Sequence, residues 1–214
     1  MASSTMTWVN LFDNQDITRD SVITNFRTMI DEDTEDVISD SQIASLITNA
    51  LLSIHRKTWI NVGYATDTTD GSDYYELPSG MTKVELAIYT NTSGVNTQLI
   101  DSNEVMREDV STSSTTAKYY ERRGNRIYLF GNPTTGTLKV WGAKIPTMPT
   151  VGSSYIDIPY QYVDVLYAYL EWQYWKRRRV PDEAQLARVS YYDLAEEVRE
   201  DLSEQFSKGA VVHG

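Results

Sequence analysis

The sequence predicts an α+β protein in which N- and C-terminal helices form a helical bundle, with an antiparallel β-meander or hairpin region inserted between them. Apolar residues near both ends recur at intervals of three and four, the spacing of one helix face. In the middle of the chain they alternate with polar residues, as in a half-buried strand. With 214 residues, 41% hydrophobic and 23% charged, the composition is that of a folded globular protein. We expect a single domain over residues 1–214.

Two helices are expected within about residues 17–60. The first covers about Ile17 to Ile30, and an acidic turn, DEDTED, follows it. We interpret this turn as solvated rather than as a Ca²⁺ loop, because it lacks the central glycine and the closing glutamate of an EF-hand. The second helix begins beside Ser39, Asp40 and Ser41, which are candidate N-caps. Its apolar stripe consists of Ile43, Leu46, Ile47, Ala50, Leu51 and Ile54.

The β-rich insertion is expected over about residues 72–145. A short strand ends at Pro78, and KVELAIYT (83–90) alternates apolar and polar residues. The strongest strand signal is the pair of runs 118–123 and 126–130 around Gly124-Asn125, which predicts a hairpin with a two-residue turn. A second turn then leads to a strand at Leu138–Trp141, so we expect a three-stranded antiparallel meander.

Two more helices are expected within about residues 159–208. Pro159 suits the first turn of a helix that runs to about Arg178 and is apolar on nearly all sides, so it should be buried on nearly all sides. The last helix starts at VPDE and ends near Lys208-Gly209. Its narrower apolar stripe consists of Ala187, Tyr191, Leu194, Val198 and Leu202.

Charge is unevenly distributed along the chain. The formal net charge is -11, yet residues 111–181 carry ten cations and four anions. An acidic protein with one basic belt lacks the pervasive positive field of a general DNA-binding protein. This distribution suits copies that meet acidic face to basic face, or a protein that lets DNA pass without holding it.

Residue patterns of catalysis are missing. There is no cysteine, no glycine-rich phosphate loop, no nucleophile elbow and no metal-binding spacing of histidines and carboxylates. We interpret His55, at the end of the second helix, as a cap or surface residue. No run of about 18 apolar residues could span a membrane. We therefore expect no enzymatic activity, no catalytic residue, no cofactor, no metal and no membrane contact.

The stretch LEWQYWKRRRVPDE (170–183) places four cations directly after three aromatic residues. The dipole of the helix C-terminus accounts for part of the basic run. The aromatics give this helix more apolar surface than one small bundle covers, so we expect a contact between copies in which the arginines pair with a neighbour's acidic helices. The predicted subunit-interface residues are Tyr169, Trp172, Trp175, Arg177, Arg178 and Arg179.

Arg122, Arg123 and Arg126 flank the predicted hairpin turn and share its strands with tyrosines. They could form a stacking platform for nucleic acid. We favour cross-strand pairs on a solvated sheet edge, where charge also discourages unwanted strand pairing. If the hairpin lines a DNA passage or meets a partner, weak contact is enough.

The order of these signals resembles a known family. The successive motifs are ISDSQIASLITNALLSIHR, YYELPSGM, YYERRGNRIYLFGNPTTGTLKVWG and IDIPYQYVDVLYAYLEWQYWKRRRVPDEAQLARVSYYDLAEEVRED. In this order they resemble the head-to-tail adaptor, or connector, proteins of tailed bacteriophages, over most of residues 20–202.

The resemblance implies a structural virion protein. Twelve copies would form a ring beneath the portal protein, continue the channel for double-stranded DNA without sequence-specific binding, and provide a platform for the next neck or tail protein. It implies a location in the neck between capsid and tail, assembly in the host cytoplasm, and no enzymatic activity or cofactor. It also implies that the C-terminal segment docks on the portal, through Phe206, Lys208, Val211 and Val212.

Two alternatives remain open. The chain could be another neck or tail structural protein, such as a stopper or nozzle component, which would attach to a different face. It could also be a carbohydrate-binding or hydrolytic tail module, given its aromatics and carboxylates. The helical patterns at both ends argue against this second alternative, because such modules are dominated by strands.

Overall fold

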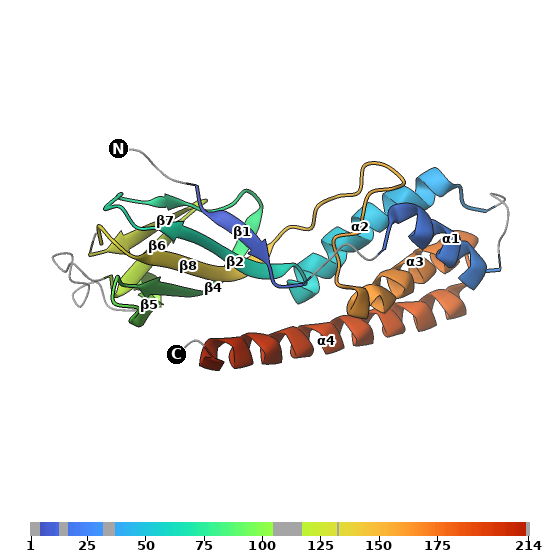
Figure 1. Cartoon of the computed structure of the whole chain (residues 1–214). Helices are drawn as coiled ribbons and strands as arrows, with labels where there is room; N and C mark the ends of the chain where they lie inside the picture. Colours follow the sequence, from blue (N-terminus) through green and yellow to red (C-terminus); the bar gives the residue numbers. More distant parts are fainter. Residues whose placement is uncertain (1–4, 13–16, 32–36, 105–116, 132, 213–214) are drawn as a thin grey trace. The chain divides into compact units, whose positions relative to one another are not determined.

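The computed structural model describes residues 5–12, 17–31, 37–104, 117–131 and 133–212 (Figure 1). Its fold class is mixed α+β, as predicted. The chain divides into two compact units. A strand unit comprises Met1–Leu11, Val62–Lys144 and Val211–Gly214, and a helical unit comprises Phe12–Asn61 and Ile145–Ala210. The predicted insertion from 72 to 145 begins earlier, because the first strand after the N-terminal helices starts at Val62.

The helical unit contains the helices expected from the sequence. These are α1 (Arg19–Met29), α2 (Asp40–Thr58), the short 3₁₀ helix η3 (Tyr160–Tyr162), α3 (Val163–Arg178) and α4 (Pro181–Val212). The predicted stripe of α2 is confirmed, since five of its six residues are 0% exposed and only Leu46 is partly exposed. In α1 the buried residues are Val22, Ile23 and Phe26, whereas Met29 near its end is 47% exposed. The last helix extends to Val212, beyond its predicted end.

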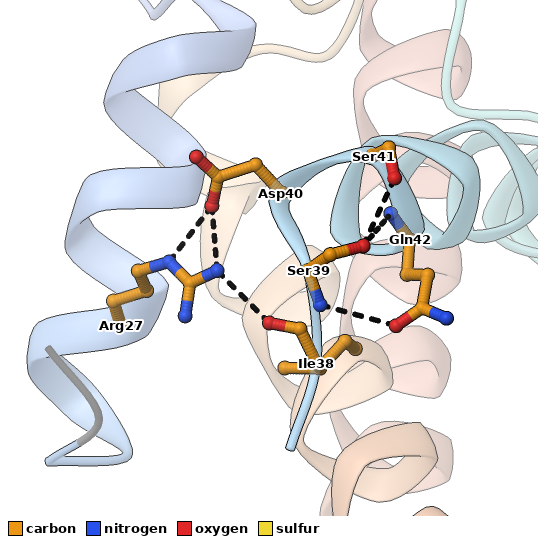
Figure 2. A network of polar contacts seen from close by, with 6 residues as sticks. All are labelled: Arg27, Ile38, Ser39, Asp40, Ser41 and Gln42. Carbon is orange, nitrogen blue, oxygen red and sulfur yellow. Dashed lines mark hydrogen bonds and ion pairs between the residues drawn. The ribbon is translucent and has the colours of Figure 1, made fainter. Parts of the chain in front are cut away.

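The start of α2 is fixed by a polar network with α1, shown in Figure 2. Ser39 is the N-cap: its Oγ accepts from the backbone N–H of Gln42 at 3.4 Å, and its own N–H donates to Gln42 Oε1 at 3.1 Å. Arg27 of α1 donates to Asp40 Oδ1 through Nε (2.8 Å) and Nη2 (2.6 Å), and to the carbonyl of Ile38 at 2.9 Å. This network sets where α2 begins relative to α1.

The strand unit is one sheet that curls back on itself. Its strands are β1 (Thr7–Asn10), β2 (Val62–Thr68), β3 (Tyr75–Glu76), β4 (Met81–Thr90), β5 (Asn96–Asp101), β6 (Tyr119–Arg123), β7 (Arg126–Phe130) and β8 (Thr137–Lys144). They lie in the order β1-β2-β8-β4-β5-β6-β7-β3, and only β5 and β6 pair in parallel. A bridge between Thr5 and Glu76 joins the segment before β1 to β3, the strand at the other end of this order. The sheet therefore approaches closure, which leaves few unpaired strand edges.

The inner face of this curled sheet holds the core of the strand unit. Aliphatic and aromatic side chains from most of the strands are nearly inaccessible to solvent there. They are Met6, Ala65, Tyr75, Leu77, Met81, Ala87, Tyr89, Leu99, Ala117, Tyr120, Ile127, Leu129, Leu138 and Val140.

The predicted meander is correct for the hairpin and wrong for its third strand. β6 and β7 pair through Gly124 and Asn125, and Gly124 has the positive φ (61°) that the turn requires. β8, however, pairs with β2 and β4 and not with β7. At Gly136 the chain passes so close to the end of β4 that an added Cβ would lie 2.4 Å from Thr90 O. Close approach at this glycine starts β8 alongside β4, which the local sequence pattern does not reveal.

Replacing Ser39 with Ala should lower the free energy of unfolding of the helical unit by about 1 kcal/mol, because the N-cap bond to Gln42 is lost. Urea unfolding followed by circular dichroism at 222 nm measures this. Ser45→Ala is the matched control: Ser45 Oγ bonds only to the carbonyl of Ser41 within α2, so its removal should be neutral or slightly stabilising. Equal losses in the two variants would contradict the assigned cap.

Candidate interaction surfaces

Tyr191 holds α4 against α2 and α3. Its side chain is fully buried, and its hydroxyl lies 2.8 Å from Ser53 Oγ of α2. The Tyr191 ring stacks on Trp172 of α3 at 5.8 Å between centroids and meets Tyr169 edge-on at 5.3 Å. Burial raises the pKa of Tyr191 to about 12, so the phenol stays neutral and able to donate at physiological pH. These four residues define what we call the aromatic cluster.

Two of the predicted interface residues, Tyr169 and Trp172, pack within their own chain as part of the aromatic cluster. Tyr169 and Trp172 are only partly exposed, because α4 of the same chain covers much of their ring surface. The surplus apolar surface that the sequence suggested on α3 is therefore partly satisfied within one copy. The accessible part of Tyr169 lines a hollow, described below.

The basic run at the end of α3 has a local structural explanation. Arg179 takes the left-handed conformation (φ 60°) as the C-cap, with its N–H bonded to the carbonyl of Lys176 at 3.3 Å. Arg178 donates to the Tyr174 hydroxyl at 3.1 Å and lies 5.7 Å from the centroid of the Trp175 ring. Trp175 donates to Glu171 at 3.1 Å. Arg177 and Arg179 are exposed, and they form no ion pair within the described part of the chain.

A hollow of about 580 Å³ lies beside the aromatic cluster and combines cations with apolar surface. It is lined by Asn49, Leu52, Ser53, Arg56, Lys57 and Tyr169, which belong to α2 and α3. We call it the basic hollow. The Lys57 ammonium lies 4.2 Å from the centroid of the Tyr192 ring, a cation–π contact with α4. This site was not identified from the sequence. The available signal was the helical spacing 49, 52–53, 56–57, which runs beside the apolar stripe of α2.

The three predicted hairpin cations have different roles. Arg122 is partly buried and donates to the carbonyls of Met81 (2.7 Å) and Thr82 (3.0 Å), so it fastens the hairpin to the start of β4. This burial lowers the pKa of Arg122 below its ordinary value without discharging it. Arg123 pairs with Glu121 at 2.6 Å, and Arg126 pairs with Glu76 at 3.6 Å. The charges of Arg123 and Arg126 are therefore partly balanced by these two carboxylates.

The predicted portal-contact residues lie at the end of α4. The backbone of residues 206–212 is helical, so Phe206, Lys208, Val211 and Val212 belong to a helix and not to an extended tail. Deeper in the helical unit, the Tyr162 hydroxyl donates to Asp201, and Gln205 donates to the same carboxylate at 3.0 Å. The start of α3 is thereby tied to α4 one turn before Phe206.

His55 is buried, at 3% exposure, and packs edge-on against Trp59 at 5.4 Å between centroids. The interpretation of His55 as a surface residue is therefore wrong. Burial lowers the pKa of His55 to about 4, which the charge of Asp157 opposes, so the imidazole is neutral at physiological pH. Three or more metal-ligating side chains gather nowhere in the described ranges. Most of the acidic turn, residues 32–36, lies outside them.

A protein-family model described as SU10 adaptor protein matches residues 17–211. The chain belongs to the SU10 adaptor protein family. The resemblance to head-to-tail adaptor proteins seen in the sequence is thus confirmed at the level of the family, over nearly the whole chain. The match includes both the helical unit and the strand unit.

The chain was also compared with curated proteins and with solved structures. No curated protein matches this chain. Among solved structures, a chain in the "Neck of empty GTA particle computed with C6 symmetry" is similar, with 13% sequence identity and a TM-score of 0.29. The similarity covers 80% of this chain and 83% of that chain.

Within the described ranges, no helix of the chain has the length and apolar character that a membrane span requires.

Arg122→Ala should lower the free energy of unfolding of the strand unit by roughly 1.5–3 kcal/mol, because two carbonyls of β4 lose a charged donor. Arg123→Ala removes an equal charge from the same hairpin but only an exposed ion pair with Glu121 and a cation–π contact with the Tyr128 ring, so its effect should be much smaller. Thermal unfolding of the two variants makes the comparison. A larger loss for Arg123→Ala would contradict the structural role of Arg122.

Proposed function

We propose that this protein is the head-to-tail adaptor of a phage particle. Copies of it form a ring of twelve beneath the portal protein, extend the DNA channel and present a platform to the next neck or tail protein. The observation that carries the proposal is the adaptor-family match over residues 17–211. On this proposal the protein is a structural component of the virion neck, without enzymatic activity, that assembles in the host cytoplasm.

The distribution of charge supports a role around DNA that moves. At a net charge of -11 the protein repels phosphate, so DNA would slide past it. The hairpin cations do not form an open basic track, since Arg122 is bonded to carbonyls of β4 and Arg123 and Arg126 pair with Glu121 and Glu76. Any contact of this hairpin with passing DNA would be weak and independent of sequence.

The exposed end of α3 supports a contact between copies. Arg177 and Arg179 are exposed, while Arg178 and Trp175 form a surface supported by Tyr174. We propose that these residues, with the accessible edges of Tyr169 and Trp172, belong to the interface with a neighbouring copy.

The end of α4 is the proposed portal contact. The helical backbone of residues 206–212 would present Phe206, Lys208, Val211 and Val212 on one or two helical turns. A helical segment suits docking, because most of its conformational entropy is already lost when α4 folds, before the portal binds.

The test is the mass of the full-length protein, alone and mixed with its candidate portal protein, by light scattering on a sizing column. We expect a large complex with the portal and its loss when residues 206–214 are deleted. A variant with residues 206–214 in scrambled order is the matched control for length and composition, and it should also fail to bind. A protein that stays monomeric and does not bind the portal would overturn the proposal and favour a stopper component.

A further inference from the structure

The outer face of α4 carries a stripe with no role inside its own chain. Leu186, Val189, Asp193, Glu197 and Glu200 follow one another at intervals of three or four, so they lie along one side of the helix. All five are exposed, and Leu186 is 67% accessible. Within the described residues, none of its three carboxylates forms an ion pair. We call this set the outer stripe.

The basic hollow has the complementary chemistry. Arg56 and Lys57 supply positive charge and form no ion pair within the described ranges, while Leu52 and Tyr169 supply apolar lining. The outer stripe offers an apolar pair followed by carboxylates. Each surface therefore has a partner for both the apolar and the charged part of the other.

The two surfaces cannot meet within one copy. Tyr191 packs the inner face of α4 into the aromatic cluster, where it also contacts Ser53 and Tyr169 of the hollow's lining. Asp193 and Glu197 stand on the other side of the same helix, because positions two and six residues on are rotated by about 200° and 240°. With its inner face fixed, the outer stripe of α4 points away from its own hollow.

We propose that the basic hollow of one adaptor copy receives the outer stripe of α4 of the next copy. The inference rests on the proposed ring and names the contact that builds it. Such a contact joins two different surfaces, so it is heterologous, and its repetition closes a ring when the rotation between neighbouring copies divides a full turn. It also accounts for charges of both signs on one helical unit that form no ion pair within the described residues. Being partly electrostatic, the contact should weaken as the salt concentration rises.

Disulfide trapping tests the contact directly, because the chain has no cysteine of its own. The full-length variant Arg56→Cys/Glu197→Cys is oxidised alone and together with the portal protein. We expect a ladder of covalent oligomers on a non-reducing gel that collapses to one band on reduction. Each single-cysteine variant should yield at most dimers. Cα–Cα distances in disulfides are about 4.4–6.8 Å, so ladder formation requires close approach of the two helices.

Arg56→Cys/Arg199→Cys is the matched control. Arg199 is exposed on the same helix but rotated by about 200° from Glu197, and it pairs with Glu196 of its own chain. This variant should give no ladder. If it formed a ladder as readily as the Glu197 variant, or if a portal complex formed without any ladder, the proposed contact would be overturned while the adaptor function stood. Absence of both complex and ladder would overturn the contact and the function together.

Charge exchange provides a second readout without cysteine. Arg56→Glu/Lys57→Glu should lose assembly or require at least tenfold more protein for it, and Asp193→Lys/Glu197→Lys should do the same. Combining the four changes in one chain should restore assembly, because the opposite charges still meet. If both reversals assembled like the parent protein, the hollow and the stripe would not be the seam.

Discussion

The packing of Tyr191 between α2 and α3 is the contact on which the rest of the helical unit depends. One side chain from α4 stacks on Trp172, meets Tyr169 edge-on and bonds to Ser53. A fully buried aromatic of this size contributes about 3–5 kcal/mol. Because this contact fixes the rotation of α4 about its axis, it determines which residues of α4 are covered and which are presented to solvent. The position of the outer stripe follows from it.

The same contact keeps cations and carboxylates apart within the helical unit. Arg56 and Lys57 gather at the end of α2, while Asp193, Glu197 and Glu200 of α4 occupy the side turned away from them. Charges separated in this way repel like surfaces and attract unlike ones, which favours one register between copies. In the strand unit, cations serve a different purpose: Arg122 joins β6 to the start of β4. The net charge of the chain therefore says little about any single cation.

The features predicted correctly from the sequence are those in which local signals agree. For α2, the Ser39 cap and an apolar stripe of helical spacing mark one helix, and for the β6–β7 hairpin a Gly-Asn turn separates two strand-like runs. Strand pairing over long separations could not be predicted in this way. β8 follows the hairpin but pairs with β2 and β4, and bulges in β4 turn Ala87 and Tyr89 into the core in place of Leu86. β2, which contains Thr66 and Asp67, has no apolar alternation along its length.

The candidate surfaces were predictable only in part, because they too depend on contacts between segments that lie far apart in the sequence. The aromatics of α3 stand out in the sequence, but their cover by Tyr191 comes from a different helix. The basic hollow requires residues of α2 and α3 at known positions, so no single stretch of sequence contains it. The most direct test of the account is a cryo-EM reconstruction of the protein bound to its portal. The account predicts that Asp193 and Glu197 of each copy lie within ion-pair distance of Arg56 and Lys57 of the next. Outer stripes that face solvent or the DNA channel would contradict it.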